Sequence, residues 1–500
     1  MGIYKKHFPL GLGTTRLPVL GPKDIEGLEK SIDLVSQALN AGIEYVDVGF
    51  HYAAGMAPLI LKEAFQQTNK TFAVTTKVMY GQDKTADDAR KRVELYLKTM
   101  GLTKADYFTC WTIWDYETFE RIMKKGGIYE GALRLKEEGI IDHICCSLHA
   151  SPEDMIKIIN SRAFEGVTVS YSLLNAPNMI PVLDAAYKQD ISVAVMNPLG
   201  GGMIAQNREF FSFACGGGDN GDTVHAALRF AKAHPAVDIV LGGVGNKEEL
   251  MDSVSVFSTP DPELPEKRHE RVLHQVSGLS GFCTGCKYCE GCPQDIPTAA
   301  IMQARNTLLF QAIPSYNRKG PEELLYNLQL FRKLFFDNGW MPESRELPCI
   351  KCGKCERQCT QKLGITEAVA DIYRRAAETF YTKEDHKKRL EALLVGKNYR
   401  KVGLYPNGGF SKLIIQLYRE FFGEPEFEWL QFNSDPKTWG QMADERVVHS
   451  PAEIAELKPD LILICTYKYD QDILESLRPY EEYGVRLEKL HRPEEMPWVF

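Results

Sequence analysis

Short apolar runs alternate with amphipathic stretches of helical length along residues 1–265. The stretch at 87–101 is typical, since Val93, Leu97 and Met100 recur at helical spacing. The runs between such stretches predict eight strands, near residues 10–14, 43–48, 72–77, 106–111, 142–147, 166–171, 191–196 and 237–242. Eight β–α units in about 260 residues have the size and order of a TIM (β/α)8 barrel, so we expect an α/β fold.

Two further segments follow the proline-rich, charged stretch at 258–267. Residues 266–395 hold most of the cysteines, and residues 396–500 give a strand at 401–406, a helix at 411–422 and a buried-strand run at 461–466. The pattern of this last segment resembles a small Rossmann-like α/β domain. Gly408 and Gly409 keep a turn without the full Gly-x-Gly-x-x-Gly spacing, so a bound nucleotide is only weakly indicated there.

Eight of the thirteen cysteines form two sets of four, which are Cys283, Cys286, Cys289 and Cys292, then Cys349, Cys352, Cys355 and Cys359. Three thiolates at such spacing can ligate three corners of a cubane. A fourth thiolate before a proline follows the bacterial ferredoxin pattern, in which it can ligate the other cluster. The sets predict two [4Fe-4S] clusters and electron transfer within a ferredoxin-like domain at 266–395. Tetrahedral zinc is the alternative, although zinc sites usually pair two short Cys-x-x-Cys hooks across a longer gap.

The remaining cysteines have no partner at metal-ligand spacing, and we interpret them as small apolar residues: Cys110, Cys145, Cys146, Cys215 and Cys465. With 44% hydrophobic and 25% charged residues, the chain can form large cores in roughly two to four domains. The amino terminus lacks the apolar region of a signal peptide, and no run of eighteen apolar residues occurs. We therefore expect a soluble, cytoplasmic protein without membrane partners. A net charge of -8 without a basic stripe argues against nucleic-acid binding.

Three polar residues fall near predicted strand ends, where a TIM barrel places its catalytic residues. Asp47 ends the second strand, Tyr52 follows five residues later, and Lys77 ends the third. A phenol titrates near about 10, too high for a good proton relay unless a cation stabilises the phenolate. Lys77 can supply that charge and Asp47 can orient it, so that Tyr52 exchanges a proton with a carbonyl or alcohol oxygen. Alternatively, Asp47 and Lys77 form only a structural ion pair, and Tyr52 is an aromatic residue at the rim.

The same stretches carry a resemblance to the aldo-keto reductase family. GIEYVDVGFHYAAG has Asp47 and Tyr52 at the family's spacing, and TTKV has Lys77. The resemblance continues through LGLGTTRLP, KEEGIIDHICCSLHAS, NPLGGG and GGVGNKEEL, and so covers the whole first segment. The cysteine blocks resemble the subfamily with a carboxyl-terminal ferredoxin-like domain, which extends the likeness to about residues 5–380. It implies a catalytic Asp47, Tyr52 and Lys77 acting with NAD(P)H.

The chain departs from the family at two positions. Trp111 stands where the family usually ends the fourth strand with a histidine, and an indole N–H donates but cannot exchange a proton. Thr168 stands where a glutamine usually meets the nicotinamide carboxamide. The cofactor contacts that the resemblance implies are Ser147, Thr168, Pro198, Leu199, Gly200, Gly243, Asn246 and Lys247. No arginine for a 2′-phosphate is obvious after the eighth strand, so NAD and NADP both stay open.

His149, at the end of the fifth predicted strand, has two interpretations. It can reach the barrel mouth and replace the missing histidine as a catalytic residue. A single histidine beside a serine is otherwise a hydrogen-bonded packing residue.

Together these features predict an iron–sulfur oxidoreductase that interconverts an alcohol and a carbonyl, with a sugar-like compound as one candidate substrate. The electrons that reduce the carbonyl come from NAD(P)H as a hydride, from the clusters one at a time, or from both. No flavin motif is recognisable, so the clusters could take part in turnover, serve a redox partner protein or stabilise the fold. The alternative is a redox-responsive ligand-binding or assembly protein with a degenerate, non-catalytic barrel. Trp111 and Thr168 favour it, and Asp47, Tyr52 and Lys77 oppose it.

Overall fold

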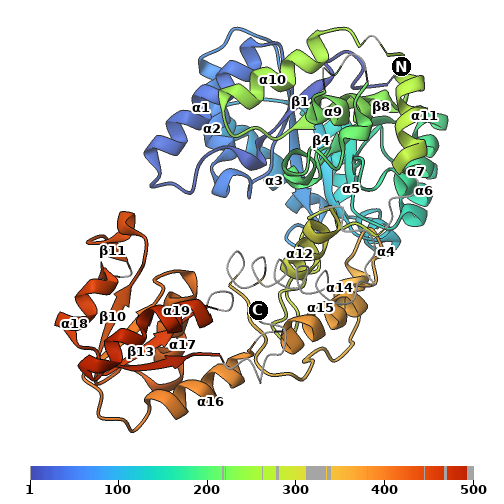
Figure 1. Cartoon of the computed structure of the whole chain (residues 1–500). Coiled ribbons are helices and arrows are strands. Elements are labelled where there is room, and N and C mark those ends of the chain that lie inside the picture. Colours follow the sequence, from blue (N-terminus) through green and yellow to red (C-terminus); the bar gives the residue numbers. More distant parts are fainter. Residues whose placement is uncertain are drawn as a thin grey trace. The chain divides into compact units, whose positions relative to one another are not determined.

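The computed structural model describes residues 2–216, 219, 221–261, 263–276, 281–310, 334, 339–379, 381–443, 445–466 and 470–491 (Figure 1). The chain forms two compact units. The first is Met1–Cys289 together with Lys354–Leu363, and the second is Glu290–Gly353 together with Gly364–Phe500. The first unit therefore runs past the predicted boundary at residue 265, and the division into three domains stays a prediction.

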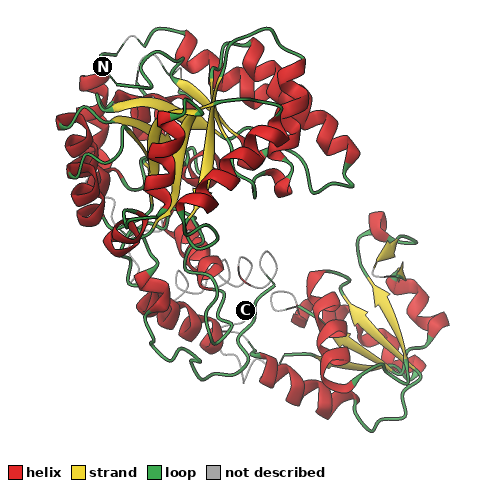
Figure 2. Cartoon of the chain, turned by 180° about the vertical axis from the view of Figure 1, so that it is seen from behind, coloured by secondary structure: helices red, strands yellow, loops and turns green. Residues whose placement is uncertain are grey.

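Eight parallel strands close into a barrel in the order β1 to β8 (Figure 2). All eight predicted strands are confirmed, with their ends shifted by a few residues at most. They are β1 (Leu10–Gly13), β2 (Tyr45–Asp47), β3 (Ala73–Met79), β4 (Ala105–Ile113), β5 (Ile141–Leu148), β6 (Gly166–Ser170), β7 (Ser192–Met196) and β8 (Val237–Gly242).

Helices lie outside the barrel between its strands (Figure 2). The sequence sets their ends: in α3, Thr85 and Asp88 form a capping box at the start, and Gly101 at φ 71° ends the helix in the left-handed region. The helices of this unit are α1 (Ile25–Asn40), α2 (Ala57–Gln66), α3 (Ala86–Met100), α4 (Tyr116–Ile122), α5 (Ile128–Glu137), α6 (Pro152–Asn160), α7 (Ala176–Lys188), α8 (Met203–Gln206), α9 (Thr223–Ala233), α10 (Lys247–Ser258), α11 (Pro265–Val276) and α14 (Lys354–Arg357).

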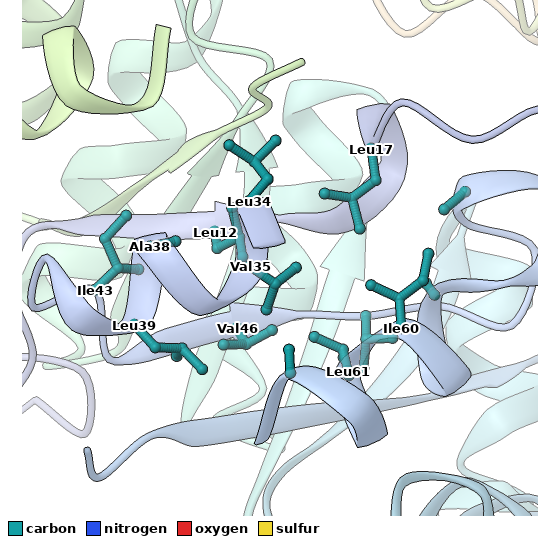
Figure 3. Close-up of a cluster of buried hydrophobic side chains, with 14 of the residues drawn as sticks. Leu12, Leu17, Leu34, Val35, Ala38, Leu39, Ile43, Val46, Ile60 and Leu61 are labelled. Carbon is teal, nitrogen blue, oxygen red and sulfur yellow. The ribbon is translucent and has the colours of Figure 1, made fainter. Parts of the chain in front are cut away.

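The space between the strands and the outer helices is filled by aliphatic side chains. Figure 3 shows this core, where Leu34 and Val35 of α1 and Leu61 of α2 lie against Leu12 of β1 and Val46 of β2. These side chains are almost completely buried. Burying apolar surface on this scale is the main force that holds the helices to the barrel.

Inside the barrel, aromatic side chains fill the end opposite the carboxyl ends of the strands. Tyr45 of β2 and Tyr107 of β4 point inward and meet Tyr4, whose ring lies edge-on to both at 5.2 and 5.0 Å between centroids. Because successive side chains of a strand alternate between faces, the residues two and four positions further along also point inward. This packing closes one end and leaves the carboxyl ends for polar groups.

The second unit contains a six-stranded sheet in the order β11-β12-β10-β9-β13-β14, parallel except for β11. The strands are β9 (Lys401–Tyr405), β10 (Glu428–Phe432), β11 (Met442–Ala443), β12 (Arg446–His449), β13 (Leu461–Ile464) and β14 (Arg486–Lys489). The helices are α12 (Thr298–Phe310), α15 (Ile365–Thr379), α16 (Lys383–Leu394), α17 (Gly409–Phe422), α18 (Ile454–Leu457) and α19 (Asp470–Leu477). The predicted strands at 401–406 and 461–466 and the predicted helix at 411–422 are therefore present.

Among the residues that the structure describes, none of the helices is both long enough and apolar enough to span a bilayer.

Candidate active site

The inward-facing positions of neighbouring strands bring the predicted catalytic residues together. Asp47 lies two residues after the inward Tyr45, and Lys77 lies four residues after Ala73, which pairs with Tyr45. Both side chains are therefore inside the barrel towards its carboxyl end, and both residues are only 5% exposed. Tyr52 follows at the start of a short 3-10 turn (Ala53–Gly55).

Lys77 contacts both of its predicted partners. Its Nζ donates hydrogen bonds to Asp47 Oδ2 at 2.8 Å and to the Tyr52 hydroxyl at 2.7 Å. Burial alone would lower the pKa of Lys77, but the charges of Asp47 and Tyr52 outweigh it and raise that pKa. The ammonium is thus held charged beside a phenol, the arrangement that stabilises a phenolate and makes proton transfer from Tyr52 feasible.

Trp111, on the inward face of β4, packs beside this triad. Its ring lies edge-on to Tyr52, with centroids 6.0 Å apart and planes at 80°, and the Lys77 Nζ is 5.7 Å from its centroid. The position thus presents an aromatic surface and one N–H donor where a titratable group was expected.

His149 lies just past the end of β5 and is 6% exposed. Its Nε2 is 2.7 Å from Ser147 Oγ, and its Nδ1 is hydrogen-bonded to the hydroxyl of Tyr288. Burial and then the charge of Lys77 lower the pKa of His149 to about 3, so the ring is neutral at physiological pH. His149 therefore reaches the barrel mouth, with both ring nitrogens occupied by protein groups.

Two cavities open at this mouth, and His149 and Tyr288 line both. The smaller, of about 170 Å³, is lined by Arg16, Leu148, His149, Met155, Ser170, Met179, Met196, Asn197, Gly201, Thr284, Gly285, Cys286, Tyr288, Thr360 and Gln361. The larger, of about 540 Å³, is lined by Trp114, Asp115, His149, Ala150, Ser151, Asp154, Tyr288, Arg357, Gln358, Cys359, Thr360 and Lys362. Parts of the cysteine-bearing segments thus form walls of the barrel site.

The residues expected to contact a nicotinamide cofactor lie around the same mouth but are not all available. Ser147 bonds His149, and Thr168 of β6, which pairs with Ser147 of β5 and Ala194 of β7, is buried. Asn246 caps α10 by accepting a hydrogen bond from the Glu249 N–H at 2.8 Å, and Lys247 is exposed in the first turn of that helix.

The loop after β7 contains Pro198, Leu199 and Gly200, and Gly243 lies in the loop after β8. Arg16, from the short turn after β1, reaches both loops. Its guanidinium donates to Gly201 O at 2.9 Å, and a Cβ on Gly243 would stand 3.2 Å from its side chain. A positive charge therefore lies at the loops after β7 and β8, where TIM barrels often bind phosphate.

Ser170 is a further polar residue of the mouth, and it lines the smaller cavity. Its Oγ is buried and has no hydrogen-bond partner among the described residues. Thr168 and Ser170 are two residues apart in β6, so they share its inward face. The strand period could have indicated Ser170, whereas nothing in the sequence links Arg16 or Tyr288 to the site.

Three cysteines of the first set, Cys283, Cys286 and Cys289, belong to the same unit as Cys359 of the second set. Burial, together with the charges of Cys286, Cys289 and Cys359, raises the pKa of Cys283 to about 12, against a hydrogen bond from Gly285 that lowers it. Cys359 also raises the pKa of Cys286. The pKa of Cys283 is thus affected by three other cysteines of the first unit. Among the described residues, however, no three His, Cys, Asp or Glu side chains converge in the way that would hold a metal ion, so the two clusters stay a prediction.

Comparison with known proteins identifies the barrel. Residues 9–212 match the family model described as "Aldo/keto reductase family". The N-terminal half of the chain carries an aldo/keto reductase family domain. An aldo-keto reductase from Bacillus halodurans, in its holo form, is 16% identical with a TM-score of 0.45, over 54% of this chain and 93% of its own. One from Klebsiella pneumoniae in complex with NADPH is 16% identical with a TM-score of 0.42, over 54% of this chain and 90% of its own. No curated protein matches the chain.

The aldo/keto reductase match includes the triad, Trp111 and His149 and ends before the first cysteine set. The predicted oxidoreductase fold of the barrel is thereby confirmed. The assignments for the cysteines and for the sheet of the second unit rest on this chain's own residues.

Proposed function

We propose that this chain is an iron–sulfur oxidoreductase. Its aldo/keto reductase domain interconverts an alcohol and a carbonyl with NAD(P)H, and the eight cysteines of its two sets ligate two [4Fe-4S] clusters. The observation that supports the catalytic role best is the double contact of Lys77, whose Nζ bonds Asp47 and Tyr52 at once. A structural ion pair would need only Asp47, whereas a proton relay needs the phenol as well.

In the proposed reaction, Tyr52 donates a proton to the carbonyl oxygen as the carbonyl carbon is reduced, and takes it back in the reverse direction. Lys77 stabilises the phenolate that remains, and Asp47 keeps the ammonium oriented. Trp111 shields the triad from water without exchanging protons. When bound, NAD(P)H supplies the hydride.

The mouth of the barrel has groups that fit a nicotinamide cofactor. The buried Ser170 Oγ lacks a partner among the described residues and is suited to a carboxamide, together with Ser147 and Thr168. Arg16 is suited to a phosphate. We assign the remaining contacts to the loops after β7 and β8, with Pro198, Leu199, Gly200, Gly243, Asn246 and Lys247.

For the first cluster we propose the ligands Cys283, Cys286, Cys289 and Cys359. This set follows the ferredoxin rule that a distant fourth cysteine completes each cluster, and all four of its cysteines belong to the first unit. A cubane separates its thiolates by its own width, so they need not converge as the ligands of a single ion do. The same rule assigns Cys292, Cys349, Cys352 and Cys355 to the second cluster, from the sequence alone.

We further propose three domains, at 1–265, 266–395 and 396–500, with the last of them Rossmann-like. Counted along the chain and setting the antiparallel β11 aside, its parallel strands have the order 3-2-1-4-5, which doubly wound sheets share. The substrate is a small carbonyl or alcohol. A redox partner protein is the second proposed partner, and it would exchange electrons with the clusters.

The test is titration of the anaerobically purified protein with NADH and NADPH, followed by nicotinamide fluorescence. We expect saturable binding of at least one nucleotide, weakened in Arg16→Ala if the arginine meets a phosphate. Binding of neither nucleotide would contradict the proposed reaction. It would favour a non-catalytic, ligand-binding barrel, the function to which Trp111 beside Tyr52 points.

A further inference from the structure

Tyr288 is the residue by which the first cysteine set enters the barrel site. It lies between Cys286 and Cys289 in sequence, and its hydroxyl is hydrogen-bonded to His149 Nδ1. Its ring lies edge-on to His149 at 5.3 Å and to Trp114 at 4.6 Å between centroids. Contacts on two sides fix the ring, so the position of the hydroxyl at the mouth is determined.

The hydroxyl of Tyr288 lies at the barrel mouth, where it bonds His149 just past the end of β5. Tyr288 lines both cavities, and the larger of them is within the size range of small-molecule sites. The backbone N–H of His149 donates to Ile113 O at 2.8 Å, so the partner of Tyr288 lies beside the end of β4, the strand that carries Trp111.

The hydrogen bonds around His149 determine whether the Tyr288 hydroxyl donates to His149 or to a group in the cavity. A neutral imidazole carries one N–H, so one ring nitrogen donates and the other accepts. If Ser147 Oγ donates to Nε2, then Nδ1–H donates to the Tyr288 oxygen, and the Tyr288 proton is left for a group in the cavity. The chain Ser147–His149–Tyr288 can thus present one O–H donor at the mouth.

We propose that Tyr288 binds the substrate oxygen of the barrel reaction through this O–H, and that His149 is the positioning residue that holds it. The inference rests on the proposed function. A donor at this place compensates for Trp111, since the family's usual histidine is missing from β4. The substrate site is then complete only when the cysteine-bearing segment is folded against the barrel.

The experiment compares Tyr288→Phe with Tyr187→Phe, an exposed tyrosine outside the site. Reduction of glyceraldehyde, phenylglyoxal and 4-nitrobenzaldehyde by NADPH is measured anaerobically, and calorimetry gives the dissociation constant of 4-nitrobenzyl alcohol. We expect Tyr288→Phe to lower kcat/KM for the carbonyl at least about tenfold and to weaken alcohol binding by a similar factor. The KM for NADPH and the iron content should stay unchanged, as in Tyr187→Phe.

If Tyr288→Phe loses its iron, a second pair of variants, at His149, still tests the proposal. His149→Leu should reproduce the lower kcat/KM for the carbonyl, and His149→Gln, which keeps a donor and an acceptor, should recover part of the loss. Unchanged kinetics and alcohol binding in Tyr288→Phe, or equal effects of Leu and Gln at position 149, would overturn this inference alone. No carbonyl reduction by the wild-type protein would overturn the proposed function instead.

Discussion

Asp47 and Lys77 form an ion pair that is almost excluded from water, with side chains 8% and 4% exposed. Removing one partner of such a pair leaves the other charged and buried, which costs about 3–5 kcal/mol. We therefore expect Lys77→Met to destabilise the first unit by this amount in urea unfolding. The double variant Asp47→Asn/Lys77→Met should recover part of that loss, and neither variant should be active.

Comparing the double variant with Lys77→Met separates the cost of an unpaired buried charge from the cost of the packing lost with the lysine side chain. If the double variant were no more stable than Lys77→Met, the pair would not be strongly coupled, and Lys77 would not be held charged by Asp47.

At the residue scale, the sequence predicted the triad because each member lies near the end of a strand whose apolar run is easily recognised. It also predicted Trp111, from its place in the same pattern. Arg16 and Tyr288 were missed because their contacts join segments that no periodicity relates. The sequence offered two interpretations for His149, and the two hydrogen bonds to its ring favour a positioning role.

At the element scale, the barrel strands were predictable because parallel strands buried on both faces are short, apolar and regularly spaced. The helix ends follow local signals such as the capping box of α3. No pattern in the sequence indicated the buried polar groups of the second unit. His386 of α16 is one of them, since it is fully buried among Tyr381, Phe410 and His491.

Both ring nitrogens of His386 lack a hydrogen-bond partner among the described residues, and burial lowers its pKa to about 3. The unfolded chain, with a histidine pKa near about 6.5, takes up a proton that the folded chain excludes. Stability should thus fall as the pH drops from about 6.5 towards 3. We expect His386→Leu to stabilise the second unit by about 1–3 kcal/mol, and more at pH ~5 than at pH ~8.

Hydrogen exchange of peptides from residues 401–422 measures this effect within the second unit. The same substitution at His225, in the first unit, is the control and should leave that exchange unchanged. A His386→Leu variant less protected than the wild type at both pH values would mean that the imidazole makes a stabilising contact.

At the scale of the whole molecule, Cys283, Cys286 and Cys289 belong to the same compact unit as the barrel, and so does Cys359. The sequence predicted two sets of four but left open which fourth cysteine serves which cluster. We expect about eight iron and eight sulfide per chain. Cys359→Ser should alter the EPR signal of the same reduced cluster as Cys286→Ser, and Cys349→Ser should alter the other.

Cys215→Ser is the matched control, because that thiol lies outside both sets. If Cys359→Ser and Cys349→Ser changed the same signal, each set would ligate its own cluster. Stoichiometric zinc with negligible iron after anaerobic purification would contradict the clusters altogether.

In the proposed reaction Tyr52, held by Lys77 and Asp47, exchanges a proton with a carbonyl oxygen while a nicotinamide reduces the carbon. The most direct measurement is transfer of deuterium from NADPH or NADH deuterated at C4 to the carbonyl carbon of 4-nitrobenzaldehyde, followed by mass spectrometry. We expect a deuterated alcohol with the wild-type protein, and a rate at least about 10²-fold lower with Tyr52→Phe at unchanged iron content. An alcohol without deuterium from the wild type, or a Tyr52→Phe rate within tenfold of the wild-type rate, would contradict it.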